Sequence, residues 1–137
     1  ELSGEEFLVF SISALDPDSF NLDICTYEGE ENEITINFGP PHIHLFMYKP
    51  FKIKTLDDQI EALEEITHKI FNEEMIAVKY KARFLFIPFI PFTVYSFISP
   101  QKHKILLDKK RLLKSVSWKG TFNYPKDGTH ADFNWGG

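Results

Sequence analysis

Two histidines, His42 and His44, are the residues whose type and spacing come closest to a reactive site. They stand two apart in a segment that alternates polar and apolar residues, so both imidazoles point to one face of the predicted strand. Histidine is a common metal ligand, but zinc normally takes at least three protein ligands. Asp23, His130 and Asp132 are the candidates for the remaining positions. The pair therefore indicates either a metal-dependent hydrolase or an interface.

Classical catalytic motifs are absent from the sequence. It contains no P-loop, no dinucleotide-binding glycine pattern, no HExxH and no nucleophile elbow. Its one cysteine, Cys25, lies in an alternating segment and is predicted to be a buried apolar side chain, which fits a reducing cytosol. We therefore predict a cytoplasmic protein that is not an enzyme and has no cofactor or metal.

Length and hydropathy predict one domain without a membrane segment. The chain has 137 residues, the usual size of a single domain. Its longest apolar run, residues 84–98, is interrupted by Pro88 and Pro91. The run is also shorter than the roughly twenty residues that a membrane-spanning helix needs.

Charge is distributed very unevenly along the chain. Residues 1–74 carry 17 acidic and 4 basic side chains, net −13, and residues 75–137 carry 3 and 11, net +8, which together give the −5 of the whole chain. Such polarity favours a charged partner over a neutral small molecule, because summed surface fields steer association and select its sign.

Five of the 17 acidic residues of this pole cluster on one predicted helix. Between Lys54 and Lys69 this helix carries five acidic residues and no basic one. Complementary charge speeds association and excludes wrong partners. We predict that these carboxylates, with two from the polar loop before them, mimic phosphate charge and bind a basic partner protein. The predicted partner-binding residues are Asp57, Asp58, Glu61, Glu64, Glu65, Glu30 and Glu31.

The basic pole gives another hypothesis, a nucleic-acid-binding module. Residues 102–119 are rich in lysine and include Trp118, a combination that could contact phosphates and stack a base. Because the whole chain is acidic, long-range attraction to nucleic acid would be opposed. We therefore rank this hypothesis below the immunity protein and the hydrolase. The basic residues of segment 102–119 are Lys102, Lys104, Lys109, Lys110, Arg111, Lys114 and Lys119.

Strands are predicted on both sides of one long helix. The strand-like segments are residues 7–13, 20–27, 33–38, 42–48, 75–80, 93–99 and 116–124. The helix covers about residues 55–71, with Thr55 as N-cap and Asp58 completing a variant capping box. A short helix near 104–114 is preferred to two strands about a turn. These elements give an α+β domain, a mainly antiparallel sheet with the long helix on one face.

Helical spacing also predicts which side chains of the long helix are buried. The predicted set is Ile60, Leu63, Thr67 and Ile70. We expect them to pack on a sheet that includes residues 34–38 and 76–80.

The stretch from residue 33 to residue 80 combines EITINFGPPHIHLF, the capped acidic helix and MIAVKY in that order. This pattern resembles small bacterial immunity proteins of polymorphic toxin and contact-dependent inhibition systems. The resemblance implies a cytosolic antidote that binds one cognate toxin domain, often a nuclease, and has no catalytic activity. The leading prediction is therefore an immunity protein that occludes a basic, nuclease-like toxin encoded beside it.

Overall fold

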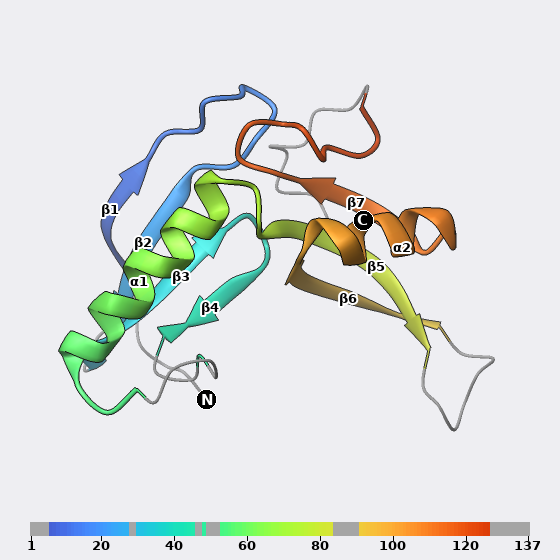
Figure 1. Cartoon of the computed structure of the whole chain (residues 1–137). Helices are drawn as coiled ribbons and strands as arrows, with labels where there is room; N and C mark the ends of the chain where they lie inside the picture. The colour runs from blue at the N-terminus through green and yellow to red at the C-terminus, as the bar shows by residue number, and fades with distance from the viewer. Residues whose placement is uncertain (1–5, 28–29, 46–47, 49–52, 84–90, 127–137) are drawn as a thin grey trace.

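Two antiparallel sheets, each with one helix packed on it, make up the molecule (Figure 1). The computed structural model describes residues 6–27, 30–45, 48, 53–83 and 91–126. The α+β class and the long helix are confirmed. The expectation of a shared sheet is wrong, because residues 34–38 and 76–80 belong to different sheets.

The first sheet is a meander whose strands pair in chain order. It consists of β1 (Glu6–Ile12), β2 (Leu22–Tyr27), β3 (Glu30–Phe38) and β4 (His42–His44). Alternation along β2 and β3 buries Ile24, Ile36 and Phe38 on the face that the long helix covers. Strand β4 is shorter than predicted, because the chain turns at Leu45, whose carbonyl accepts a hydrogen bond from the Tyr48 N–H at 3.1 Å.

Helix α1 (Leu56–Phe71) begins where the sequence predicts. The Thr55 hydroxyl accepts a hydrogen bond from the Asp58 N–H at 3.2 Å, and the Asp58 carboxylate accepts one from the Thr55 N–H at 3.0 Å. The predicted capping box is therefore confirmed. Two residues beyond the helix, Glu73 adopts a positive φ of 57°, a left-handed conformation that prevents the helix from continuing.

The predicted buried face of α1 is wrong by about one position along the helix. The buried side chains are Gln59, Ala62, Ile66 and Ile70. Only Ile70 is common to this set and the predicted one. Ile60 is 43% exposed, while Leu63 and Thr67 are half-buried.

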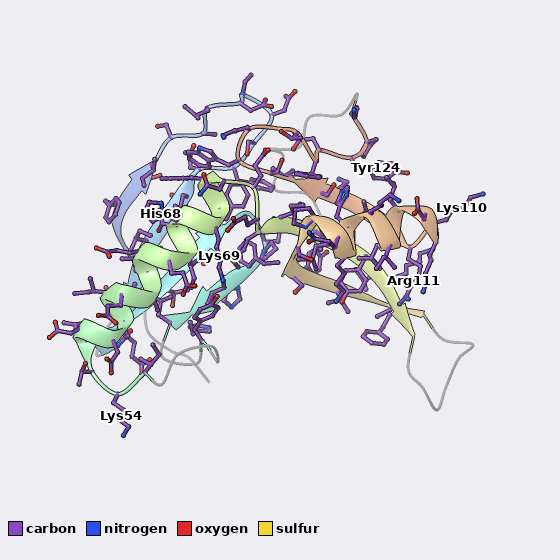
Figure 2. All side chains as sticks on the ribbon, viewed as in Figure 1. Lys54, His68, Lys69, Lys110, Arg111 and Tyr124 are labelled. Carbon is purple, nitrogen blue, oxygen red and sulfur yellow. The ribbon has the colours of Figure 1, made fainter. Side chains whose placement is uncertain are left out.

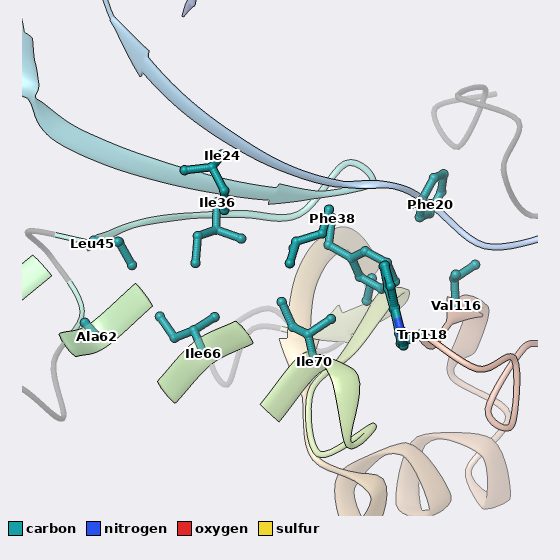
Figure 3. Close-up of a cluster of buried hydrophobic side chains, with 12 residues drawn as sticks. Phe20, Ile24, Ile36, Phe38, Leu45, Ala62, Ile66, Ile70, Val116 and Trp118 are labelled. Atoms are coloured by element: carbon teal, nitrogen blue, oxygen red, sulfur yellow. The ribbon is translucent and has the colours of Figure 1, made fainter. Parts of the chain in front are cut away.

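Two contacts with the first sheet account for this rotation. Gln59 Oε1 accepts a hydrogen bond from the backbone N–H of Ile34 in β3 at 2.9 Å, which draws a polar side chain inward. The side chain of Ala62 is fully buried and small, so the helix can approach the sheet closely at that turn. Ile66 and Ile70 then point toward the sheet from one side of the helix (Figure 3).

The second sheet has the order β6-β5-β7. Its strands are β5 (Ile76–Arg83), β6 (Pro91–Ile98) and β7 (Leu112–Val116), all antiparallel to their neighbours. Side chains of β5 alternate between two cores. Ile76 and Val78 face a small cluster that includes Leu106, and Ala77 faces the large cluster shared with the first sheet.

Helix α2 (Pro100–Asp108) exists but lies earlier than the predicted range of 104–114. Ser99 is its N-cap, accepting a hydrogen bond from the Lys102 N–H at 3.3 Å, and Pro100 occupies the first turn, where a missing N–H is harmless. The helix ends before Lys110, which has a φ of 56°. The residues beyond it then form β7 rather than more helix.

The large core joins the two sheets. Val116 at the end of β7 and Trp118 pack into the same cluster as Phe38 and Ile70 (Figure 3). The Trp118 ring centre lies 4.7 Å from that of Phe71. The predicted strand over 116–124 is wrong beyond Val116, because residues 117–124 form a series of turns that pairs with β7 through a bridge between Ser115 and Tyr124.

Candidate functional site

The outward side of α1 carries acidic and apolar side chains together. We call this surface the α1 outer face; it consists of Leu56, Asp57, Ile60, Glu61 and Glu64, all of them exposed. Leu56 and Ile60 are each 43% exposed and lie one helical turn apart. In Figure 2 the labelled basic residues near α1 lie at its ends, Lys54 before its start and His68 and Lys69 in its last turn.

Two of the predicted binding carboxylates are already engaged inside the fold. Asp58 is half-buried in the capping box, and its carboxylate also accepts a hydrogen bond from the Lys54 N–H at 2.8 Å. These backbone hydrogen bonds hold the pKa of Asp58 below its usual value. Glu65 pairs with Lys69 one turn later, Oε1 to Nζ 3.4 Å. The carboxylates most available to a partner are therefore Asp57, Glu61 and Glu64.

The other predicted binding residues, Glu30 and Glu31, are the first two residues of β3. Their side chains are outside the described part of the structure. The polar loop expected before residue 33 is thus shorter than predicted, because the hairpin pairs Tyr27 with Glu30.

The structure places His42 and His44 on one face of β4, as predicted, with ring centres 5.0 Å apart. His44 Nδ1 lies 3.0 Å from the Thr35 hydroxyl. Asp23 is two strands away, about 10 Å at the spacing of a sheet, and accepts a hydrogen bond from Ser11 instead. His130 and Asp132 lie outside the described residues. Among those that are described, no three His, Cys, Asp or Glu side chains form a group that could hold a metal ion.

The structure buries the aromatic side chain on which the nucleic-acid hypothesis depends. Trp118 is only 4% exposed and packs in the core, so it cannot stack on a base. Arg111 Nε donates a hydrogen bond to the Lys81 carbonyl at 2.8 Å, and the Lys102 ammonium lies 5.4 Å from the Tyr80 ring centre. The segment is divided among α2, a turn and β7.

Glu73 is a buried charge that sequence reasoning missed. Its Oε1 accepts hydrogen bonds from the Ser117 hydroxyl at 2.6 Å and from the N–H groups of Lys119 at 2.8 Å and Thr121 at 3.2 Å. Burial by itself would raise the pKa of Glu73, but these hydrogen bonds lower it below the ordinary value. The carboxylate thus fastens the end of α1 to the turns that follow β7. Nothing in its sequence context indicates this role.

His103 and Ser115 form a buried pair whose hydrogen-bond direction argues against a nucleophile. Ser115 is fully buried, and its hydroxyl donates to the Phe122 carbonyl at 2.5 Å. Its only hydrogen is used there, so His103 Nε2, 3.0 Å away, must donate to the serine oxygen rather than accept from it. Burial lowers the pKa of His103, and a hydrogen bond to Phe122 opposes this only in part. The pair supports the fold.

Cys25 is buried, as predicted, and receives a hydrogen bond from the Asn37 side chain at 3.4 Å. Neither α1 nor α2, the helices of the described residues, has the length and apolar character needed to cross a bilayer.

Together these features define an α+β protein with exposed carboxylates on the outer face of its long helix. None of the protein families, curated proteins or solved structures compared with the chain matches it.

Proposed function

We propose that this chain is an immunity-type protein that binds and neutralises a basic, nuclease-like toxin domain through the α1 outer face. The proposal brings together the resemblance of residues 33–80 to bacterial immunity proteins and the charge of this face. No catalytic residue is required, since an antidote of this class acts by covering its partner.

One observation carries the proposal: two large apolar side chains lie exposed beside three carboxylates. Leu56 and Ile60 are on the outside of α1 because the helix buries Gln59 and Ala62 instead. Interfaces commonly have an apolar centre and a polar rim, and the centre supplies most of the residence time. The neighbouring acids, Asp57, Glu61 and Glu64, supply the charge that a basic surface attracts.

The mechanism that follows is occlusion. A nuclease must hold the phosphates of its substrate with basic side chains, and these also attract carboxylates. The α1 outer face would bind that basic surface, with Ile60 in contact with the toxin and the carboxylates paired with lysines and arginines of the toxin. Nucleic acid is then excluded by both volume and charge.

Growth rescue tests this function. The chain is co-expressed in bacteria with the toxin encoded by its neighbouring gene. We expect the wild type to restore growth and the triple variant Ile60→Lys, Glu61→Lys and Glu64→Lys to fail, because all three side chains are exposed and the change reverses the surface without entering the core.

Matched controls separate loss of binding from loss of folding. Glu74→Lys makes a single Glu→Lys change at an exposed residue beyond α1, and Lys109→Glu reverses one charge of the other pole. Both should rescue growth like the wild type. Rescue by the α1 triple variant, with normal toxin expression, would show that the binding surface lies elsewhere.

A further inference from the structure

A groove runs along α2, in the half of the molecule that the proposed function does not use. It has a volume of about 380 Å³ and lies between α2 and the turns of residues 121–126. Its apolar wall includes Pro100, Leu107, Phe122 and Tyr124. Leu107 and Tyr124 are 39% and 37% exposed, although they line a concave surface. A hollow of this composition suits an apolar side chain from outside.

Lysines stand on the rim of this groove. Lys104 and Lys126 both line it and both are exposed. The Lys104 side chain keeps 80% of its surface exposed, and its Nζ is 3.9 Å from Asp108 Oδ2, so this ion pair neutralises little of its charge. The groove therefore selects a segment that brings an apolar side chain with carboxylates beside it.

The α1 outer face of the same chain has this combination. Leu56 and Ile60 project from adjacent turns, and Glu61 and Glu64 lie on the same exposed side. The two surfaces also belong to oppositely charged parts of the chain, residues 1–74 with net −13 and residues 75–137 with net +8. Two copies attract when unlike poles meet and repel when like poles meet.

We propose that the chain self-associates head to tail, with the α1 outer face of one copy seated in the α2 groove of the next. Because α1 and α2 are packed on different sheets, the two surfaces do not meet within one copy (Figure 1). The contact is heterologous, so each copy added leaves one groove and one α1 outer face open at the ends of the assembly. The inference does not rest on the proposed function. Both use the α1 outer face, so a bound toxin would displace the neighbouring copy.

Sedimentation velocity of the full chain at increasing protein concentration tests the proposal. The mean mass should rise with concentration at low salt and return to that of a monomer in about 1 M salt, where the Debye length is about 3 Å. One variant removes the acidic surface, Ile60→Ser with Glu61→Lys, and another removes the groove, Leu107→Ser with Lys104→Glu. Each should weaken self-association by about tenfold or more. Glu74→Lys and Lys109→Glu, matched in charge, should associate like the wild type.

Mixing the two double variants distinguishes this geometry from a symmetric dimer. The first variant keeps its groove and the second keeps its α1 outer face, so the mixture should form a dimer and nothing larger. Absence of a complex in the mixture, or self-association that neither variant weakens, would overturn the proposal. Circular dichroism confirms that each variant is folded.

The groove variant also separates this inference from the proposed function. It should lose self-association and still restore growth in the presence of toxin, because its α1 outer face is intact. A wild type that stays monomeric at high concentration but rescues growth contradicts only the self-association. A wild type that associates but fails to rescue contradicts only the toxin binding.

Discussion

The two halves of this molecule share a plan and differ in charge. Each is an antiparallel sheet with one helix on it, and the division at Glu74 coincides with the change from net −13 to net +8. In both halves the helix leaves apolar side chains outside, Leu56 and Ile60 on α1 and Ile105 and Leu107 on α2. On α1 these side chains stand beside carboxylates, and on α2 they stand beside lysines and the single acid Asp108. Both helices therefore carry more apolar surface than the fold buries, α1 in the acidic half and α2 in the basic half.

The largest expected effect concerns which side of α1 supports the acidic half. Ile66 is fully buried and Ile60 is 43% exposed, although both are isoleucines of the same helix. Ile66→Ala should lower the free energy of unfolding by about 2 to 5 kcal/mol, because it leaves a cavity in the large core. Ile60→Ala should change it by no more than about 0.5 kcal/mol. Chemical denaturation measures the unfolding free energy of both variants. If Ile60→Ala costs more than Ile66→Ala, α1 has the rotation that helical spacing predicts.

A smaller effect is expected where the halves are fastened together. Glu73→Gln weakens the hydrogen bonds from Ser117, Lys119 and Thr121 and should cost about 1 to 3 kcal/mol in unfolding free energy. Glu74→Gln, at the exposed neighbouring position, is the control. Equal stabilities for the two variants would mean that the buried carboxylate does not join the halves.

The stability that Glu73 contributes should also depend on pH in the acid range. The pKa of Glu73 in the folded chain lies below its ordinary value of 4.5, so its contribution to stability is present above that pH. The contribution is lost as the pH falls through the folded pKa, because protonation then favours unfolding. Thermal melts of the wild type and Glu73→Gln should therefore converge toward low pH. A constant difference across the acid range contradicts the assignment.

The smallest expected effect is a change of stability with pH near neutrality, and it comes from His103 in the basic half. Burial holds the pKa of His103 below its ordinary value of 6.5, so the unfolded chain takes up this proton first. Stability contributed by the neutral His103 is complete above about pH 6.5 and declines as the pH falls from there toward the folded pKa. In His103→Gln this part of the pH dependence should disappear, while the acid loss due to Glu73 remains. An unchanged profile would show that His103 does not titrate differently on unfolding.

Local signals in the sequence predicted much of the fold. The Thr55–Asp58 capping box fixes where α1 begins, and alternation fixes which faces of β2 and β3 are buried. The rotation of α1 could not be predicted in this way, because it depends on a hydrogen bond between Gln59 and Ile34, 25 residues apart. A signal for α2 was present in Ser99-Pro100, an N-cap followed by proline, but the same pair also suits a turn.

The candidate site was predictable only in its charges. Exposed carboxylates on α1 follow from composition, and Asp57, Glu61 and Glu64 are exposed as expected. The apolar part of the α1 outer face depends on the rotation of the helix, and helical spacing places Ile60 in the core. The α2 groove combines residues from a helix and from turns up to 26 positions away, so no local pattern reports it.

The rate at which the chain binds the proposed toxin at different salt concentrations tests the role of the α1 outer face most directly. The variant is Asp57→Lys, Glu61→Lys and Glu64→Lys, which leaves the Asp58 cap intact; the comparison is Lys109→Glu with Lys110→Glu. At low salt the α1 variant should associate more slowly by about an order of magnitude or more, and salt should reduce the difference as it screens the charges. The Lys109 and Lys110 variant should associate at nearly the wild-type rate. If the Lys109 and Lys110 variant associates more slowly than the α1 variant, or if neither variant differs from the wild type, the α1 outer face is not the surface that binds the toxin.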